Sequence, residues 1–227
     1  MIRGVYTAVR APIWSSHEAF IRRWRLHGGR SMAAEQFWSP IAHYVHGDAV
    51  LDSDAFPGAA QDIDGVGDIW WQDEVAYART RDAADAPEVW ADGAQTLDQA
   101  RSRYIIGRDV AIRPRDVPAT IGVWLFHIFD AAEGPSDWST ALIDEIERMP
   151  ADTIHVGKAI NSEWQYDLYM ELGFDDLKAA SAAFRSVTDL TDPRTNITGF
   201  PTQLTIVPVW RHILYDKGRC LGAGKTH

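Results

Sequence analysis

The feature that most constrains the fold of this chain is a succession of elements that stops at a proline-bounded segment, RPRDVP (113–118), and then starts again. Before that segment, β-rich runs alternate with segments of helical periodicity. The run after Ser15 or Ser16 has an N-cap and an acidic first turn, as helices prefer. The predicted strands are 2–9, 41–45, 67–71 and 104–112, and the predicted helices start after Ser16 and span 73–84 and 86–100.

This order is strand, helix, strand, strand, helix, strand, with one extra helix before the last strand, and it matches the ferredoxin-like plan. Beyond 118 the pattern repeats more weakly: Gly122-Val123-Trp124 echoes Gly4-Val5-Tyr6, and a strand at His155 echoes the one at His43. Asp167 stands where Asp68 stands in the first copy. We expect an α+β protein of two tandem units. The expected divisions are a unit carrying the site (1–113), a degenerate second unit (119–210) and a flexible tail (211–227).

His27 is the first candidate for chemistry. Phe20, Trp24 and His27 recur at helical spacing, which places the imidazole on the inward face of the predicted helix, and Gly28-Gly29 is predicted to end or loosen that helix. A neutral imidazole in such a place can act as a general acid or base near neutral pH. The alternative is a core histidine bonded to a backbone carbonyl.

The strand AHYVH (42–46) holds two more histidines. Side chains alternate along a strand, so Tyr44 and His46 share one face while His43 points to the other. We favour His46, because a tyrosine hydroxyl beside an imidazole can stabilise an enolate oxygen while the imidazole moves the proton. If the pleat is displaced by one residue, His43 takes that place.

Further candidates for substrate binding are aromatic residues and one carboxylate. Trp70 and Trp71 must point to opposite faces of their strand, so one lines a cavity next to the helices and the other packs the opposite side. Asp68 is a catalytic or binding candidate, although an aspartate at a strand start more often caps a turn or faces water. The predicted substrate-binding residues are Tyr6, Trp24, Asp68, Trp70 and Trp71.

Composition excludes several classes of function. The formal net charge of −10 argues against nucleic acid or an anionic membrane as partner, and the single cysteine, Cys220, argues against a disulfide framework. The acidic loop 47–65 lacks the spacing of a calcium loop, so we expect it to cover the cavity, and the histidine spacings match no common metal motif. The start has no long apolar segment, and we expect a soluble cytoplasmic protein.

The first half resembles the EthD-like branch of the dimeric α+β barrel proteins. The resemblance rests on the opening strand, on Phe20, Trp24 and His27 as F-x-x-x-W-x-x-H, on Tyr44 in AHYVH, and on D-G-V-x-D-I-W-W at 64–71. It implies that two ferredoxin-like units form a barrel, here within one chain, and that the ligand lies between sheet and helices with His and Tyr transferring protons. Members include polyketide cyclases, dehydratases, muconolactone isomerases and cofactor-free monooxygenases, and haem-binding relatives exist.

The sequence thus predicts a cofactor-independent lyase, dehydratase, cyclase or isomerase that acts on an aromatic or polyketide-like molecule. His27 and His46 are the predicted acid–base pair, and Tyr44 the oxyanion partner. A cofactor-free monooxygenase and a non-catalytic ligand-binding protein are the alternatives. No metal or cofactor is expected, haem being left open, and assembly into a homodimer is expected.

Overall fold

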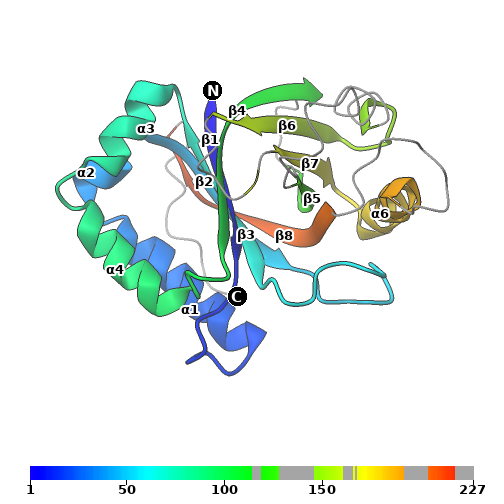
Figure 1. The fold of residues 1–227 in the computed structure, drawn as a ribbon, viewed down its shortest axis with the longest axis horizontal. Coiled ribbons are helices and arrows are strands. Elements are labelled where there is room, and N and C mark those ends of the chain that lie inside the picture. Colours follow the sequence, from blue (N-terminus) through cyan, green and yellow to red (C-terminus); the bar gives the residue numbers. More distant parts are fainter. Residues whose placement is uncertain (114–118, 128–145, 161–165, 167, 192–203, 218–227) are drawn as a thin grey trace, which may run out of the picture.

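The protein forms a closed barrel of eight described strands with helices on its outside (Figure 1). The computed structural model describes residues 1–113, 119–127, 146–160, 166, 168–191 and 204–217. The predicted α+β barrel is confirmed. Within the described ranges, no helix is both long and apolar enough to cross a membrane.

The order of elements in the first half agrees with the sequence prediction. Its elements are β1 (Ile2–Ala8), α1 (His17–Ser31), α2 (Glu35–Trp38), β2 (Ile41–Ala49), β3 (Gly65–Trp71), α3 (Glu74–Arg81), α4 (Ala86–Thr96) and β4 (Arg103–Arg113). Those of the second half are β5 (Ile121–His127), β6 (Thr153–Ala159), β7 (Leu168–Phe174), α6 (Leu177–Thr191) and β8 (Leu204–Asp216). Asp167 and most of the helix expected at 136–149 lie outside the described residues.

The strands follow one another around the barrel in the order β1-β3-β2-β8-β5-β7-β6-β4, all antiparallel. The first half therefore contributes β4-β1-β3-β2 and the second half β8-β5-β7-β6. The halves join at two seams, where β2 pairs with β8 and β4 pairs with β6. The sheet is continuous because each outer strand of one half pairs with an outer strand of the other.

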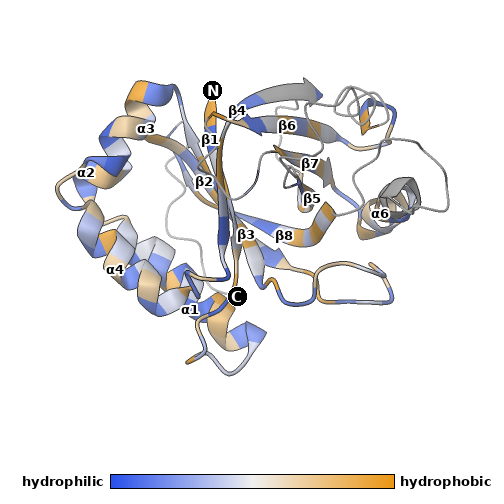
Figure 2. Cartoon of the chain, viewed as in Figure 1, coloured by the Kyte–Doolittle hydropathy of each residue, from blue (hydrophilic) through white to orange (hydrophobic). Residues whose placement is uncertain are grey.

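The two faces of the sheet have different partners. Val5 and Ile105 point into the barrel and pack with Trp124 and Val207 of the second half. Tyr6, the neighbour of Val5, points outward and packs with residues of α1. Helices α1 to α4 lie together outside the first half, and α6 lies outside the second (Figure 1). Helix α4 carries both hydrophobic and hydrophilic residues (Figure 2), and only Ala86, Val89 and Thr96 of it are buried, as expected for a helix with one buried face.

Helix α1 starts where the sequence predicts and ends later. The side chain of Ser16 caps it by accepting a hydrogen bond from the backbone N–H of Ala19 (3.1 Å). The helix continues through Gly28 and Gly29 to Ser31, so the predicted break is wrong. Gly28 instead allows close packing, because a Cβ placed there would lie 2.9 Å from Leu214 and 3.2 Å from the imidazole of His46.

Strand β8 overturns part of the predicted tail. Residues 211–216 continue this strand, in which Ile213 pairs with Val45 and Asp216 with His43. Without them β2 would pair on this side only through Asp48 and Ala49, so these residues are needed for most of the β2–β8 seam. Residues 218–227 lie outside the described part of the chain.

The long loop between β2 and β3 packs on the second half, and the prediction that it covers the cavity is wrong. The ring of Phe56 is fully buried at 5.2 Å from the ring of Phe184 on α6. The hydroxyl of Ser181 donates to the carbonyl oxygen of Ala55 (2.6 Å). The loop is thus part of the core on the helix side of the second half.

A buried cluster of charged residues fills one part of the barrel interior. Arg3, fully buried, donates two hydrogen bonds of 2.7 Å to Asp68 and others to Glu171 and to Asp109 (3.3 Å). Its guanidinium carbon lies 4.1 Å from the centre of the Trp70 ring. Because Asp68 is on β3 and Glu171 on β7, this one cation links both halves of the barrel.

Candidate functional site

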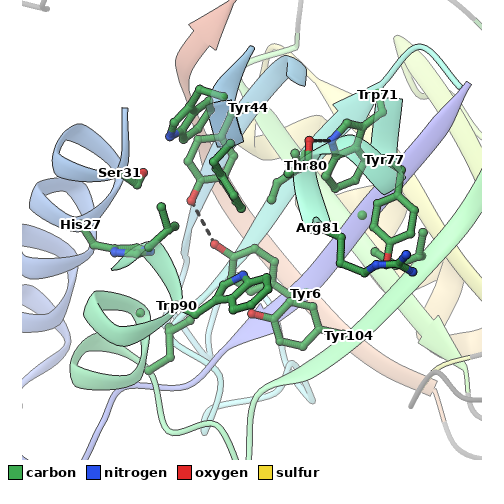
Figure 3. Close-up of a pocket in the computed structure, with 18 of the residues that line it drawn as sticks. Tyr6, His27, Ser31, Tyr44, Trp71, Tyr77, Thr80, Arg81, Trp90 and Tyr104 are labelled. Atoms are coloured by element: carbon green, nitrogen blue, oxygen red, sulfur yellow. Dashed lines mark hydrogen bonds between the residues drawn. The ribbon is translucent and has the colours of Figure 1, made fainter. Parts of the chain in front are cut away.

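A cavity of 510 Å³ lies between the outer face of the first half and its helices (Figure 3). That size is typical of sites for small molecules. Its walls are largely aromatic and aliphatic, and among the described residues that line it Arg81 is the one permanent charge. The aromatic lining residues are Tyr6, Phe37, Trp38, Tyr44, Trp71, Tyr77, Trp90 and Tyr104.

His27 lines this cavity and is held by a carboxylate. Its Nδ1 lies 2.6 Å from Oδ2 of Asp92 on α4, and Arg23 makes an ion pair with the same carboxylate (2.7 Å). Burial lowers the pKa of His27 below its ordinary value, although Asp92 acts to raise it. The imidazole is therefore neutral at pH 7, and with Nδ1–H donating to Asp92 its Nε2 carries the free lone pair. This pair can act as a general base.

Two tyrosine hydroxyls face the same cavity. The hydroxyls of Tyr6 and Tyr44 lie 3.0 Å apart, and His27 points toward them from α1 (Figure 3). Burial raises the pKa of both phenols, that of Tyr44 more strongly, so both are protonated at neutral pH. Neutral phenols of this kind can donate hydrogen bonds to a carbonyl or enolate oxygen.

His46 lies behind the tyrosines and does not line the cavity. Its Nε2 lies 2.5 Å from the hydroxyl of Tyr44, and its ring stacks on that of Trp24 with centroids 3.9 Å apart. Complete burial lowers the pKa of His46 well below its ordinary value. The prediction that Tyr44 and His46 share the helix-side face is confirmed, but His46 can act on a ligand only through Tyr44.

The remaining predicted residues divide between the two faces of the sheet. Trp71 lines the cavity, where its indole N–H donates to the hydroxyl of Thr80 (2.8 Å). Trp24 is fully buried behind the cavity wall. Three predicted residues do not reach the cavity, because they alternate onto the face that points into the barrel: His43, Asp68 and Trp70. The sequence expectation that Trp70 and Trp71 serve opposite sides is thus confirmed.

Asp92 and the buried role of Arg3 were missed by sequence reasoning. Asp92 lies 65 residues from His27, and a single carboxylate within a helical pattern resembles any solvated position. The buried position of Arg3 could have been inferred from its place between Ile2 and Val5 in an otherwise apolar strand. Among the described residues, no group of three or more His, Cys, Asp or Glu side chains has the arrangement of a metal site.

The barrel and its cavity define an α+β barrel protein with an aromatic-lined pocket on one of its two halves. No family model matches the chain, and no curated protein matches it. Solved structures do share its fold. An anthrone oxidase-like protein matches with a TM-score of 0.60 and 9% identity, over 99% of this chain and 96% of that one.

Two further structures are similar along most of their length. A proposed monooxygenase from Fusobacterium nucleatum matches with a TM-score of 0.53 and 11% identity, over 93% of each chain. A proposed chlorite dismutase matches with a TM-score of 0.52 and 10% identity, over 93% of this chain and 94% of that one. At such identities the likeness concerns the fold alone.

Proposed function

We propose that this chain is a cofactor-independent enzyme that removes a proton next to a carbonyl group of an aromatic or polyketide-like molecule, as a lyase or isomerase. One observation carries the proposal: a neutral His27–Asp92 pair and the paired hydroxyls of Tyr6 and Tyr44 face one apolar cavity. A base and hydroxyl donors beside each other suit enolisation, because the charge that develops on oxygen is met by donors already in place.

In the proposed reaction Nε2 of His27 takes a proton from the carbon next to the carbonyl. The electron pair of the broken C–H bond moves onto the carbonyl oxygen, which accepts a hydrogen bond from the Tyr6–Tyr44 hydroxyl pair. Collapse of the enolate then expels a leaving group at the next carbon, as in a dehydratase, or takes a proton at another carbon, as in an isomerase. Asp92 fixes the imidazole and stabilises it once it is protonated.

The lining favours an uncharged ring system as substrate. Arg81 is exposed and pairs with Asp82, so it does not leave an unpaired cation facing the ligand. Trp71 and Tyr104 offer flat apolar walls on the sheet side of the cavity. Burial of an aromatic ligand against them would supply the binding energy, while His27 and the hydroxyls would fix its orientation.

The test measures hydrogen–deuterium exchange of 1-tetralone, an aromatic ketone with acidic protons next to its carbonyl, by NMR in D₂O. We expect His27→Gln to slow the catalysed exchange by about 10²–10⁴-fold, the usual contribution of a general base. His17→Gln is a matched control, because His17 also lies on α1 with its Nδ1 near a carboxylate, Asp64 (3.2 Å), but does not line the cavity. Equal rates in wild type and His27→Gln would refute the proposal.

A second candidate is a cofactor-free monooxygenase, favoured by the fold similarity to an anthrone oxidase-like protein along 99% of this chain. The same base would form a carbanion at a CH₂ group; addition of dioxygen and loss of water would convert that group to a carbonyl. Uptake of one O₂ per turnover distinguishes this reaction from elimination, which consumes none. A third outcome, ligand binding without any exchange or oxygen uptake, would favour a non-catalytic binding protein.

We also propose that the two halves are tandem ferredoxin-like units, the first of them EthD-like. Each half arranges its strands in the order fourth, first, third, second, which supports the first part. The EthD-like assignment rests on the residues around His27, Tyr44 and Trp71. A chain whose second half is replaced by another ferredoxin-like unit, with the same strand order, should still form the closed barrel.

The proposal needs no cofactor. If the cavity held a haem, His27 would be the residue to reach iron through Nε2. Among the described lining residues, however, the two haem propionates would find one cation, Arg81, which is already paired with Asp82. The lining residues therefore suit an uncharged ligand better than a haem with its two negatively charged propionates. An absorption spectrum of the purified protein tests this choice, since a Soret band would overturn it.

A further inference from the structure

We infer that Tyr6, and not Tyr44, is the hydroxyl that donates to the ligand, and that the ligand presents a hydrogen-bond acceptor such as a ketone oxygen to it. The inference rests on the proposed function for the identity of the site, and it names which group that site recognises. It follows from the directions of the hydrogen bonds in a buried chain that runs from His46 through Tyr44 to Tyr6.

The chain starts at His46. Its Nδ1 is buried without a hydrogen-bond partner in the described part of the protein, whereas Nε2 contacts the hydroxyl of Tyr44. A neutral imidazole carries its proton on one nitrogen only. A proton on Nδ1 would leave a buried N–H donor unsatisfied, which folded proteins tolerate less well than an unsatisfied acceptor. The proton therefore belongs on Nε2, and His46 donates to Tyr44.

The hydroxyl of Tyr44 has one proton to donate. Because its oxygen receives the Nε2–H of His46, that proton is free to point to the other neighbour, the oxygen of Tyr6 at 3.0 Å. Tyr6 receives a second donor from Trp24, whose indole N–H lies 3.4 Å from the same oxygen. An indole N–H can only donate, so this contact has a fixed direction.

With Tyr44 and Trp24 donating to its oxygen, Tyr6 has only its own proton left, and that proton points into the cavity. The ring has little freedom to turn away: it stacks on Tyr104 with centroids 4.9 Å apart, and it lies so close to Gly67 that a Cβ there would be 2.1 Å from Cζ of Tyr6. Hydrogen bonds from Tyr44 and Trp24 lower the pKa of Tyr6 in part, against burial, which raises it. Tyr6 is thus also the better proton donor of the pair.

A reversed chain would select a different ligand. If His46 carried its proton on Nδ1, Tyr44 would donate to His46 and Tyr6 to Tyr44. Neither hydroxyl would then have a proton for the ligand, and both could only accept a hydrogen bond from it. The direction of the chain therefore decides between ligands that accept and ligands that donate. A site arranged to bond one polar group rejects an analogue that lacks it.

The first experiment reads the tautomer of His46 directly. The ¹⁵N chemical shifts of labelled histidine, assigned by comparison with His46→Gln, distinguish a proton on Nε2 from one on Nδ1. We expect the Nε2–H form in the wild-type protein. The Nδ1–H form would overturn the inference, whatever the protein catalyses.

The second experiment measures the affinity of 9-fluorenone and of fluorene by titration. Fluorenone has no proton on the carbons next to its carbonyl, so the result does not depend on catalysis. We expect fluorenone to bind about tenfold more tightly, the effect of one good hydrogen bond, with the preference lost in Tyr6→Phe and kept in Tyr44→Phe. The reverse pattern, or a preference that survives in Tyr6→Phe, would refute the inference. Absence of tetralone exchange with this pattern intact would refute only the proposed reaction.

Discussion

Replacing Arg3 with methionine should destabilise the protein by about 3–5 kcal/mol, the range measured when one partner of a buried ion pair is removed. Glu171 keeps an ion pair with Arg211 (3.2 Å), and Asp109 keeps its hydrogen bonds with His155 (3.0 Å) and Tyr169 (2.9 Å). Asp68 has no other ion pair in the described part of the chain and is 1% exposed. The main cost is therefore that of the Asp68 carboxylate, which is left buried without its cation.

The assay is urea unfolding at pH 7, followed by tryptophan fluorescence. Arg3→Met/Asp68→Asn should recover much of the loss, because the uncompensated charge is gone. Arg22→Met is the control: Arg22 pairs with Glu18 on the exposed side of α1, where such pairs contribute about 0–1 kcal/mol. A loss below about 1 kcal/mol in Arg3→Met, or no recovery in the double variant, would contradict the role assigned to Arg3.

Three more predictions follow from the site. Burial keeps the pKa of His46 below its ordinary 6.5, so the unfolded chain takes up the proton first as the pH falls. The unfolding free energy should therefore decrease below pH 6.5 by up to about 1.4 kcal/mol per pH unit. Urea unfolding at several pH values should show that His46→Gln lacks this part of the pH dependence. Gly67→Ala should displace the ring of Tyr6, cost about 1–3 kcal/mol and abolish the fluorenone preference in titrations. Thr80→Val should leave the indole N–H of Trp71 unpaired and lower the unfolding free energy by about 1–3 kcal/mol, whereas Thr80→Ser should not.

Local periodicity was enough to predict much of this architecture. The spacing of Phe20, Trp24 and His27 identified the inward face of α1, and strand alternation placed Tyr44 and His46 on one face and His43 on the other. Each of these inferences uses residues within a few positions of one another, where the geometry of one helix or strand fixes which side chains share a face.

Contacts between distant segments could not be predicted in this way. Asp92 meets His27 only because α1 and α4 pack side by side, and Phe56 joins the core of the second half only because its loop extends toward α6. The prediction that 211–227 is a flexible tail was wrong for the same reason. Residues 211–216 form a strand because they pair with β2, which is distant in the sequence. The EthD-like assignment, the homodimer and the catalytic residues stay predictions.

The two seams of the barrel have a consequence for how the protein meets other chains. Each of the eight described strands has a paired neighbour on both sides, because β2 pairs with β8 and β4 with β6. A sheet without edges offers no row of unpaired backbone groups to a second chain, which is the usual route to strand addition and aggregation. We therefore expect a homodimer to form mainly through side chains of the helices and loops, and truncating the chain after β4 would expose the full edges of β2 and β4 at once.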